Sequence, residues 1–353
     1  MDFGLCMAKA DDVELIVQAE SLGYSHAWVA DSQMIWSDCY ATLALAAART
    51  RTIRLGTGVA VAGTRIPPVT AHSIATINRL APGRTFLGIG TGNTAMRLMG
   101  QKPLTVREFG EYLAVLRPLL HGEEADFSWR GRSAPIRMDM LELGFMAVEP
   151  RVPIYVSGFG PKAQALAGQY GDGLVMSIPP QPQFMGRALA AVRAGAERAG
   201  RALPADFTVS SLTAAALLEP GETLASERIV RECGPWVTSS LHYLYEKVAA
   251  GDEPPPHVRG IWKDYVRQVE QTPPERRHRR IHAGHCTYLL PEEARFVTPG
   301  LIRSTCLAGP PQEVLEQVRA LESAGLHQLI LLPSLETQHP ALERFARQVM
   351  ARL

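Results

Sequence analysis

The sequence is short of cysteine and of net charge, and each shortage excludes a class of protein. Its 36 Lys and Arg residues are balanced by 35 Asp and Glu residues, which leaves a net charge of +1. We therefore expect no nucleic-acid partner. The cysteines never stand as C-x-x-C, so neither a disulfide framework nor a cysteine-based zinc site is indicated. They are Cys6, Cys39, Cys233, Cys286 and Cys306.

Long apolar runs are also missing. No stretch approaches the roughly 20 residues that span a bilayer, and Met1 is followed almost directly by Phe3-Gly4-Leu5 instead of a basic segment and an apolar one. We therefore expect a cytoplasmic protein without a secretory signal or a membrane partner. With 46% hydrophobic residues, the chain still has enough apolar side chains to exclude disorder for most of its length.

Short apolar runs alternate with longer amphipathic stretches, which predicts a parallel sheet covered by helices. The predicted strands are Asp2–Met7, His26–Ala30, Ile53–Val59, Arg84–Ile89, Pro153–Ser157, Gly173–Ser177, Phe207–Ala216 and Gln328–Leu332. The predicted helices are Asp11–Gly23, Tyr40–Arg49, Val69–Arg79, Val106–Leu120, Pro161–Tyr170, Pro182–Ala199, Gln312–Ala324 and Ala341–Leu353. About eight strand–helix pairs are what a (β/α)8 TIM barrel requires.

Two stretches interrupt this alternation. Residues 123–150 contain Phe127–Arg132, which predicts a short hairpin after the fourth strand–helix unit. Residues 219–309 form a much longer insertion between strand 7 and helix 7. We expect a single barrel domain over residues 1–353, with the insertion as a lid that selects the substrate. The alternative is a peripheral or oligomer-forming helical pair.

Two glycine-rich turns follow predicted strands. The segment Gly88-Ile89-Gly90-Thr91-Gly92-Asn93 lacks the third glycine of a dinucleotide fingerprint, because Asn93 stands in its place. It therefore indicates a tight turn whose small residues let another group approach the backbone closely. Ser157-Gly158-Phe159-Gly160 leads into a helix that begins with Pro161. Backbone N–H groups at a helix N-terminus bind anions, and we expect a phosphate here, with a plain tight turn as the alternative.

Several motifs, in order and at matching spacing, resemble the bacterial luciferase-like superfamily. They are Ile53–Val59, Pro67–Ala71, Ala75–Ile77, Pro82–Gly92, Pro153–Val156, Gly158–Lys162, Ala167–Gly173, Gly309–Glu313 and Ala324-Gly325. The resemblance covers most of the chain except the insertion, and it is greatest to the deazaflavin-dependent branch, the methylene-tetrahydromethanopterin reductases and deazaflavin-type glucose-6-phosphate dehydrogenases. That family is built on a (β/α)8 barrel.

The resemblance implies FMN or coenzyme F420 at the C-terminal end of the barrel. It implies a non-proline cis peptide between Gly58 and Val59, and a phosphate held by the loop from Ser157 to Gly160. The cofactor residues that it implies, together with Asp31 as a polar group of the second strand, are Asp31, Gly58, Val59, Gly90, Thr91, Gly92, Ser157, Gly158, Phe159 and Gly160. Met7, Trp36 and Met176 are expected to line the substrate pocket, and a homodimer is implied as well.

Two departures from the dehydrogenase branch and one from luciferase itself concern the chemistry. Ser32 stands where that branch has a histidine, and Asn93 where it has an acid. Neither side chain acts as a general base near neutral pH, so oxidation of an alcohol by a His and Glu pair is not expected. Thr91 stands where an arginine contacts the FMN phosphate in luciferase itself, which weakens the assignment of FMN without excluding it, so FMN and coenzyme F420 both stay open.

The candidate catalytic residues are Ser32, Asn93 and, in the insertion, His242. The insertion also carries His282 and His285, but no second ligand pair with suitable spacing accompanies them, so we expect no metal site. The sequence thus predicts an oxidoreductase that acts on a small organic substrate by hydride transfer or oxygen activation. The alternatives are a reduced-FMN-dependent monooxygenase and a non-catalytic, flavin-free barrel subunit.

Overall fold

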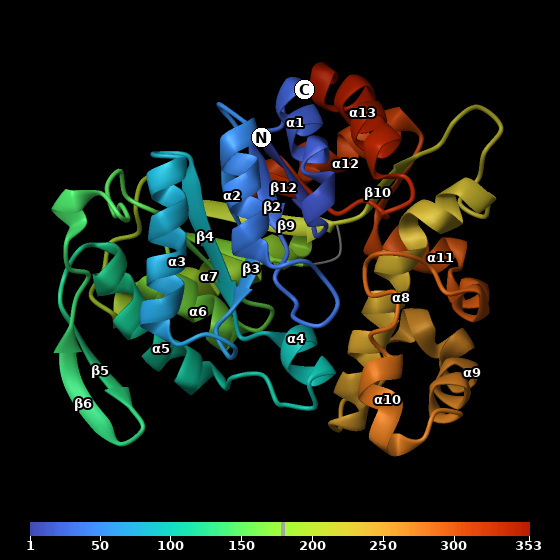
Figure 1. Ribbon diagram of the computed structural model, residues 1–353. Helices are drawn as coiled ribbons and strands as arrows, with labels where there is room; N and C mark the ends of the chain where they lie inside the picture. The colour runs from blue at the N-terminus through green and yellow to red at the C-terminus, as the bar shows by residue number, and fades with distance from the viewer. Residues whose placement is uncertain (178–180) are drawn as a thin grey trace. The chain divides into compact units, whose positions relative to one another are not determined.

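The computed structural model describes residues 1–177 and 181–353, which divide into two compact units (Figure 1). Unit 1 comprises Met1–Met176, Met185–Ser211 and Leu326–Ile330, and unit 2 comprises Ser177–Phe184, Leu212–Gly325 and Leu331–Leu353. Each unit is described by itself below.

Eight parallel strands close into a barrel, which confirms the predicted fold class. They are β1 (Asp2–Met7), β2 (His26–Val29), β3 (Arg54–Val61), β4 (Thr85–Gly90), β7 (Ile154–Ser157), β8 (Gly173–Met176), β9 (Thr208–Thr213) and β12 (Gln328–Leu331). Around the barrel they run β1-β12-β9-β8-β7-β4-β3-β2. Neighbouring strands for which pairing is recorded, such as β2 and β3, pair in parallel, as strands joined by crossover helices must.

The helices of unit 1 follow the predicted ranges to within a few residues. They are α1 (Glu14–Ser21), α2 (Cys39–Arg49), α3 (Pro67–Leu80), α4 (Asn93–Leu98), α5 (Val106–Leu120), α6 (Pro161–Tyr170) and α7 (Gln183–Arg198), with the 3-10 turn η1 (Ala10–Asp12) before α1. The predicted hairpin is present as the antiparallel pair β5 (Ala125–Trp129) and β6 (Arg132–Ile136), with the 3-10 turn η2 (Leu141–Leu143) after it. The short helix α4 was not predicted, because six residues are too few to show a helical period.

An aromatic cluster occupies the barrel interior. The ring of Trp28 lies 4.4 Å from that of Phe86 and 5.7 Å from that of Tyr155. The indole nitrogen of Trp28 donates to Oε1 of Gln328, at 3.1 Å, so the buried polar atom is satisfied.

Glycines on neighbouring strands make room for these rings. A Cβ atom on Gly56 would lie 2.3 Å from the ring of Phe86, and one on Gly88 would lie 2.8 Å from the ring of Trp28. Real Cβ contacts are never this short, so any other residue at either position would displace the aromatic cluster.

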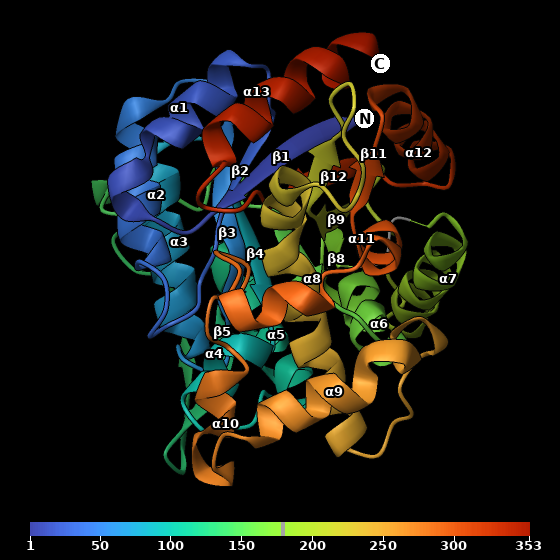
Figure 2. The same ribbon diagram turned by 90° about the vertical axis from the view of Figure 1, so that its right-hand side faces the viewer.

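Unit 2 contains the whole insertion, residues 219–309, and the helices α12 and α13. Its elements are β10 (Ala215–Leu217), α8 (Glu227–Ala249), η3 (Pro256–Val258), α9 (Arg259–Glu270), α10 (Pro274–Arg280), η4 (Pro291–Phe296), α11 (Pro299–Thr305), β11 (Leu307–Gly309), α12 (Pro311–Ser323), α13 (Gln338–Gln348) and η5 (Met350–Arg352). Figure 2 shows α8 beside α11 and α9 beside α10, and both pairs are in contact. Ile229, Val237 and Tyr265 belong to its buried apolar core.

The single predicted strand Phe207–Ala216 is wrong in one respect. The structure divides it into β9 and β10, and β10 pairs in parallel with β11, a strand that was not predicted. The carbonyl of Thr213 accepts from the amide of Leu332, and that of Ala214 from the amide of Leu307. The chain therefore changes its pairing partner between these two residues, which an uninterrupted apolar run does not reveal.

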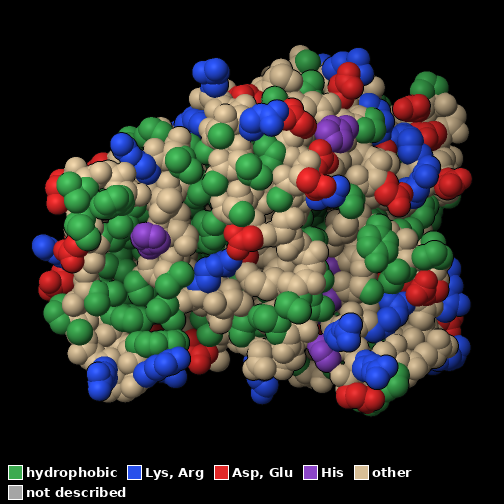
Figure 3. All heavy atoms as spheres, viewed as in Figure 1, with side chains coloured by type: hydrophobic (Ala, Val, Ile, Leu, Met, Phe, Trp, Pro, Cys, Tyr) green, Lys and Arg blue, Asp and Glu red, His purple; other side chains and the backbone are tan. Residues whose placement is uncertain are grey.

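Charged side chains are dispersed over the face shown in Figure 3, with both signs intermixed, as the net charge of +1 leads one to expect. Among the described residues, no helix has the length and apolar character needed to cross a membrane. In the same part of the chain, no group of three or more His, Cys, Asp or Glu side chains is arranged to hold a metal ion.

Candidate active site

The predicted cofactor residues of unit 1 gather at the C-terminal end of the barrel strands. Parallel strands all end at the same face, so Met7, Ser157 and Met176, the last residues of β1, β7 and β8, share it. Met7 and Met176 are buried, at 3% and 1% exposure. Both side chains are therefore packed within this end of the barrel.

Three of the predicted cofactor residues, from three different strands, are direct neighbours. A Cβ atom on Gly90 would lie 3.1 Å from Cβ of Ser157 and 3.2 Å from Cγ2 of Val59. The sequence separates these residues widely, and the closure of the sheet brings them together. A larger residue than glycine at position 90 would fill the space between the two side chains.

The peptide bond between Gly58 and Val59 is cis, as the family resemblance implied. It coincides with a shift in the pairing of β3 with β4 between Thr57 and Ala60. Gly58 packs so closely on the adjacent strand that a Cβ atom would lie 2.7 Å from Cβ of Trp28. Glycine at this position is therefore required by the packing of the strand.

The turn after β4 positions Asn93. Gly92 adopts the left-handed conformation, with φ 82°, and begins helix α4, whose first residue is Asn93. Nε of Arg97 donates to Oδ1 of Asn93, at 3.0 Å. A guanidinium can only donate, so the side-chain atom of Asn93 that faces Arg97 is its oxygen. The NH2 group of the Asn93 side chain then points away from Arg97 as a donor. Thr91, before Gly92, is half-buried.

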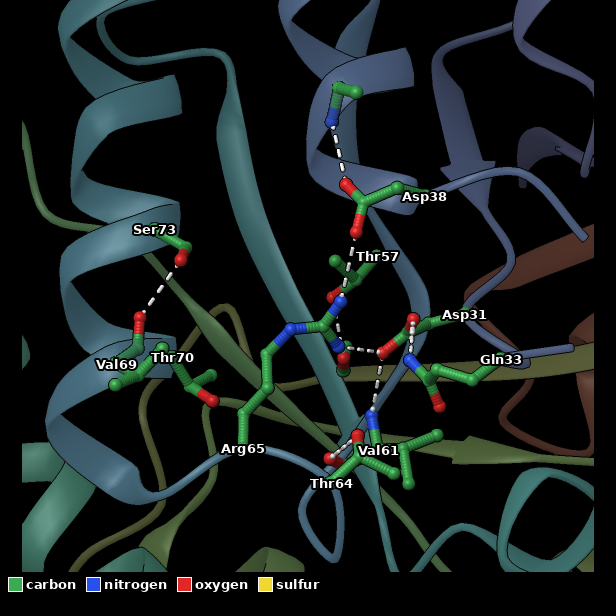
Figure 4. A network of polar contacts seen from close by, with 12 residues as sticks. Asp31, Gln33, Asp38, Thr57, Val61, Thr64, Arg65, Val69, Thr70 and Ser73 are labelled. Atoms are coloured by element: carbon green, nitrogen blue, oxygen red, sulfur yellow. Dashed lines mark hydrogen bonds and ion pairs between the residues drawn. The ribbon is translucent and has the colours of Figure 1, made fainter. Parts of the chain in front are cut away.

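Asp31 lies at the centre of a polar network between β2, β3 and α2 (Figure 4). Oδ2 accepts from Nη1 of Arg65 at 2.6 Å and from the amide of Val61 at 3.0 Å, and Oδ1 accepts from Nε2 of Gln33 at 2.5 Å. The Asp31 side chain is 2% exposed. Both of its oxygens are thus already engaged by the protein.

Arg65 is a residue of the site that the sequence did not point to. Its guanidinium also binds Asp38, at 3.1 Å, and lies over the ring of Tyr40, 5.0 Å from the ring centre. Burial lowers the pKa of Arg65, but the attraction and hydrogen bond of Asp31, together with the smaller effects of Cys39 and Tyr40, outweigh burial and raise it. Arg65 therefore stays charged and holds the loops after β2 and β3 together. No local motif marks it, because its partner Asp31 lies 34 residues away.

Ser32 and Trp36 lie in the turn that follows Asp31. Ser32 is 7% exposed, and its carbonyl accepts from the amide of Trp36, at 3.1 Å. Trp36 is half-buried. The turn therefore keeps both candidates close to the second barrel strand.

The loop between β7 and α6 has the features of an anion site, but not at every residue. The amide of Gly158 donates to the carbonyl of Val175 at 3.1 Å, and a Cβ atom on Gly158 would lie 2.8 Å from the amide nitrogen of Gln164. Gly158 is thus needed for packing and its N–H is not available to a ligand. Gly160 has open space around it, and the amides of Gly160, Lys162 and Ala163 lie in the first turn of α6, where the helix provides no acceptor.

Gln164 supports this loop and was also missed by sequence reasoning. Its side chain is buried, and Nε2 lies 3.5 Å from the carbonyl oxygen of Gly158, 3.4 Å from that of Phe159 and 4.0 Å from the sulfur of Met176. Phe159 itself is 54% exposed. The amide of Gln164 therefore connects the loop to the end of β8.

His242 belongs to unit 2, on helix α8, and is 1% exposed. Its Nε2 lies 3.2 Å from Oε1 of Glu293, and its ring stacks on that of Tyr265. Burial, followed by the nearby His282 and His242, lowers the pKa of His285 to about 3. These histidines form one buried polar cluster inside unit 2.

The sequence matches the profile of the luciferase-like monooxygenase family over residues 7–328. It is 26% identical to the 5,10-methylenetetrahydromethanopterin reductase of Archaeoglobus fulgidus over 317 residues, which cover 88% of this chain and 86% of the relative. The enzyme of the same name from Methanolobus tindarius is 34% identical over 57% of this chain. That match spans 61% of the relative, which is less than two thirds of its length.

Solved structures share the fold over the whole chain. The coenzyme F420-dependent tetrahydromethanopterin reductase from Methanopyrus kandleri superposes with a TM-score of 0.72 at 19% identity, covering 99% of both chains. The FMN complex of the oxygenating component of 3,6-diketocamphane monooxygenase from Pseudomonas putida gives a TM-score of 0.63 at 16% identity, covering all of this chain and 99% of the other. At these identities the likeness concerns the fold alone.

Proposed function

Because the chain is an oxidoreductase that belongs to the luciferase-like monooxygenase family, we propose that it transfers a hydride between coenzyme F420 and a small organic substrate. The observation that carries the proposal is the convergence of Gly90, Val59 and Ser157 beside the open N-terminus of α6. The relatives also favour the deazaflavin, since F420-dependent glucose-6-phosphate dehydrogenases of three organisms are similar to this chain, as the reductases are. FMN is the second candidate, and a reduced-FMN-dependent monooxygenase is the corresponding alternative.

The residues of unit 1 fit such a cofactor. The amides of Gly160, Lys162 and Ala163 would receive its phosphate, helped by the Ser157 hydroxyl, because the first turn of a helix offers unpaired donors. Gly58, Val59, Gly90, Thr91 and Gly92 would border its ring system. Gly158 and Phe159 would shape the loop, and Asp31 would act through the turn that it holds.

The cofactor supplies hydride transfer when bound, and the protein supplies orientation and exclusion of water. The side chains at this end of unit 1 offer hydrogen-bond donors and apolar walls. Ser32 donates through its hydroxyl and Asn93 through the NH2 group that Arg97 leaves free, whereas the carboxylate of Asp31 is engaged by Arg65. We therefore propose that Ser32 and Asn93 bind a substrate oxygen or nitrogen, between walls formed by Met7, Trp36 and Met176. A reaction that begins with removal of a hydroxyl proton is disfavoured.

Further parts of the proposal concern the rest of the chain. We propose that residues 1–353 act as one barrel domain with residues 219–309 as its substrate-selecting insertion, and that His242 takes part in proton transfer there. We also propose a homodimer in the cytoplasm. Size-exclusion chromatography with light scattering tests the dimer directly.

Cofactor binding separates the enzyme from a flavin-free barrel subunit. Titration of the purified protein with coenzyme F420 and, in a second arm, with FMN, followed by fluorescence quenching, should give saturable binding, tighter for F420. Tighter binding of FMN supports the monooxygenase. Absence of binding in both arms contradicts the enzyme proposal.

Gly160→Asp tests the phosphate position without disturbing the fold. Nothing lies within 4 Å of a Cβ atom at Gly160, and Asp is a good N-cap residue, so the variant should fold at least as well as the parent. The new carboxylate should repel the phosphate and weaken cofactor affinity about 100-fold.

The isosteric Gly160→Asn variant is the matched control, since it caps the helix equally well without a charge. It should retain affinity within about threefold. Equal affinities of the two variants would place the phosphate elsewhere. Gly158 is unsuitable for this test because a side chain there collides with α6.

A further inference from the structure

A second cavity of unit 1 lies at the opposite end of the barrel strands. Its volume is about 420 Å³, which is within the range of small-molecule sites. It is lined by Ala114, Arg117, Pro118, His121, Glu123, Gln169, Tyr170, Ala199 and Arg201. These residues come from the C-terminal ends of α5 and α6 and from the segment after α7, and we refer to the cavity as the basal cleft.

Two arginines of the basal cleft share one carboxylate. Oδ1 of Asp172 lies 3.2 Å from Nη1 of Arg117 and 3.1 Å from Nη2 of Arg201. Both arginines also donate to backbone carbonyls at the end of α6, Arg117 to Tyr170 and Arg201 to Gly171. Within the part of the chain that the structure describes, Arg117 donates to Tyr170 and Asp172 through Nη1, so its Nη2 edge is available there for another acceptor.

A third arginine adds to the positive charge. Burial lowers the pKa of both Arg201 and His121, the charge of Arg117 lowers it further, and the charge of Arg151, an exposed residue outside the lining of the cleft, has a smaller effect in the same direction. Against the three guanidinium groups stand the Asp172 carboxylate and Glu123, whose side chain is 66% exposed. The cleft therefore lies in a region of excess positive charge, and the residues that line it are half-buried or exposed.

His121 supplies an unsatisfied polar atom at the same place. Its side chain is 13% exposed, and its Nε2 is buried without a hydrogen-bond partner among the described residues. Its Nδ1 is 4.0 Å from Glu123. A buried polar atom without a partner costs free energy, which an incoming acceptor would recover.

We propose that the basal cleft binds a small organic anion, a carboxylate or phosphate group carried on an apolar body. Arg117 and Nε2 of His121 receive the anionic group, while Ala114, Pro118 and the ring of Tyr170 contact the apolar part. Arg151 does not line the cleft and contributes only the attraction of its charge. Arg201 keeps its ion pair with Asp172 and its hydrogen bond to the carbonyl of Gly171, so it holds this side of the cleft in place.

The position of the cleft links it to the candidate cofactor loop. The amide of Ile154, at the start of β7, donates to Oδ2 of Asp172, which stands just before β8. These two strands end at Ser157, three residues after Ile154, and at Met176, four residues after Asp172. A ligand that tightens the Asp172 network therefore acts on the strands that carry the cofactor loop, although its binding does not depend on the cofactor.

Binding is tested on the full-length protein with benzoate and phenyl phosphate as probes and benzyl alcohol as the neutral comparison. Calorimetry should show saturable binding of one or both anions and none of the alcohol, and the anions should raise Tm because they bind the folded state. Tighter binding of phenyl phosphate assigns a phosphate ligand, and tighter binding of benzoate assigns a carboxylate. Absence of saturable binding by either anion overturns the proposal.

Variants identify the site. Arg151→Gln should weaken the anion affinity about twofold and Arg151→Glu about tenfold, because the charge at this position acts on the cleft without lining it. Both changes lie on an exposed side chain, so the fold should be retained. Arg107→Gln is the matched control, because Arg107 is an exposed arginine of α5 outside the cleft. Unchanged affinity in both Arg151 variants would contradict the assignment.

Two further measurements make the result specific. The NMR signals of His121 should shift on anion binding, and its pKa should rise, since an anion offsets the effect of the arginines. Gly160→Asp should leave anion binding unchanged, which separates this site from the proposed cofactor site. A His121 signal that stays in place while the probe binds would locate the probe elsewhere and overturn the proposal.

Discussion

At the scale of single residues, the main lesson concerns Asp31. The sequence offered it as a polar group at the end of the second strand, suited to a cofactor. In the structure its carboxylate is buried and bound by Arg65, Val61 and Gln33. To bind a ligand directly, Asp31 would need a carboxylate oxygen that can accept a further hydrogen bond, and these contacts already occupy both oxygens. We therefore expect Asp31 to act by holding its turn in place.

Asp31→Asn should therefore affect stability before it affects chemistry. Removing one partner of a buried ion pair leaves the other without compensation, and we expect a loss of about 3 kcal/mol in the free energy of unfolding. Asp38→Asn is the matched control, because Asp38 also binds Arg65 but its side chain is 56% exposed. Asn at this position can still accept from the amide of Ala41 and so cap α2. Its loss should stay below about 1 kcal/mol. Urea unfolding measures both, and equal losses would contradict the structural role.

At the scale of elements, one carboxylate attaches α1 to the segment before β3. Oε1 of Glu20 accepts from the amides of Arg51, Thr52 and Ile53. Burial raises the pKa of Glu20, but the hydrogen bonds from Ile53, Thr52 and Arg51 outweigh it and lower the pKa to about 2. A carboxylate whose pKa is depressed in the folded state stabilises the fold above its unfolded pKa.

Glu20→Gln should cost about 1 kcal/mol at pH 7, a figure reduced for the partial exposure of the group. The difference from the parent should shrink as the pH falls from about 4.5 towards 2, because protonation of Glu20 removes the same contribution from the parent. Glu14→Gln in the same helix is the control, since Glu14 is 57% exposed and binds only a surface arginine in the described contacts. A pH-independent cost of Glu20→Gln would show that the charge is not what holds the segment.

At the scale of the whole molecule, buried neutral histidines in both units act against stability in acid. Burial, followed by the charge of Arg54, lowers the pKa of His26 in unit 1 to about 3, and burial likewise lowers that of His285 in unit 2 to about 3. Such a histidine takes up a proton in the unfolded chain below about pH 6.5 but not in the folded one. Stability is therefore lost as the pH falls from 6.5 towards 3.

The free energy of unfolding should fall by about 1 to 2 kcal/mol for each of these histidines between pH 7 and pH 5. His285→Gln should reduce this pH dependence even if it lowers stability at both pH values. His72→Gln, at an exposed position of α3, should leave it unchanged. Denaturant unfolding at the two pH values gives the slope, and an unchanged slope in His285→Gln would contradict the assignment.

The barrel and its glycine-rich turns were predictable from local pattern alone. Continuous apolar runs mark buried parallel strands whatever their neighbours are, and Gly58, Gly90 and Gly160 stand at the ends of such runs. The position of the candidate site followed from this, since parallel strands end on one face. The family resemblance added the cis bond at Gly58, which no periodicity indicates.

Other features arose only when distant segments met. Asp31 forms an ion pair with Arg65, and the amide of Gly158 donates to the carbonyl of Val175. The apolar run that begins at Phe207 changes its strand pairing at Ala214. In each case the pairing joins groups that a sequence pattern treats separately, because a buried charge or amide is satisfied by whichever group the packing brings within reach. Hydrophobic periodicity thus specified where the strands and turns are, and tertiary packing decided which polar groups remain available to a ligand.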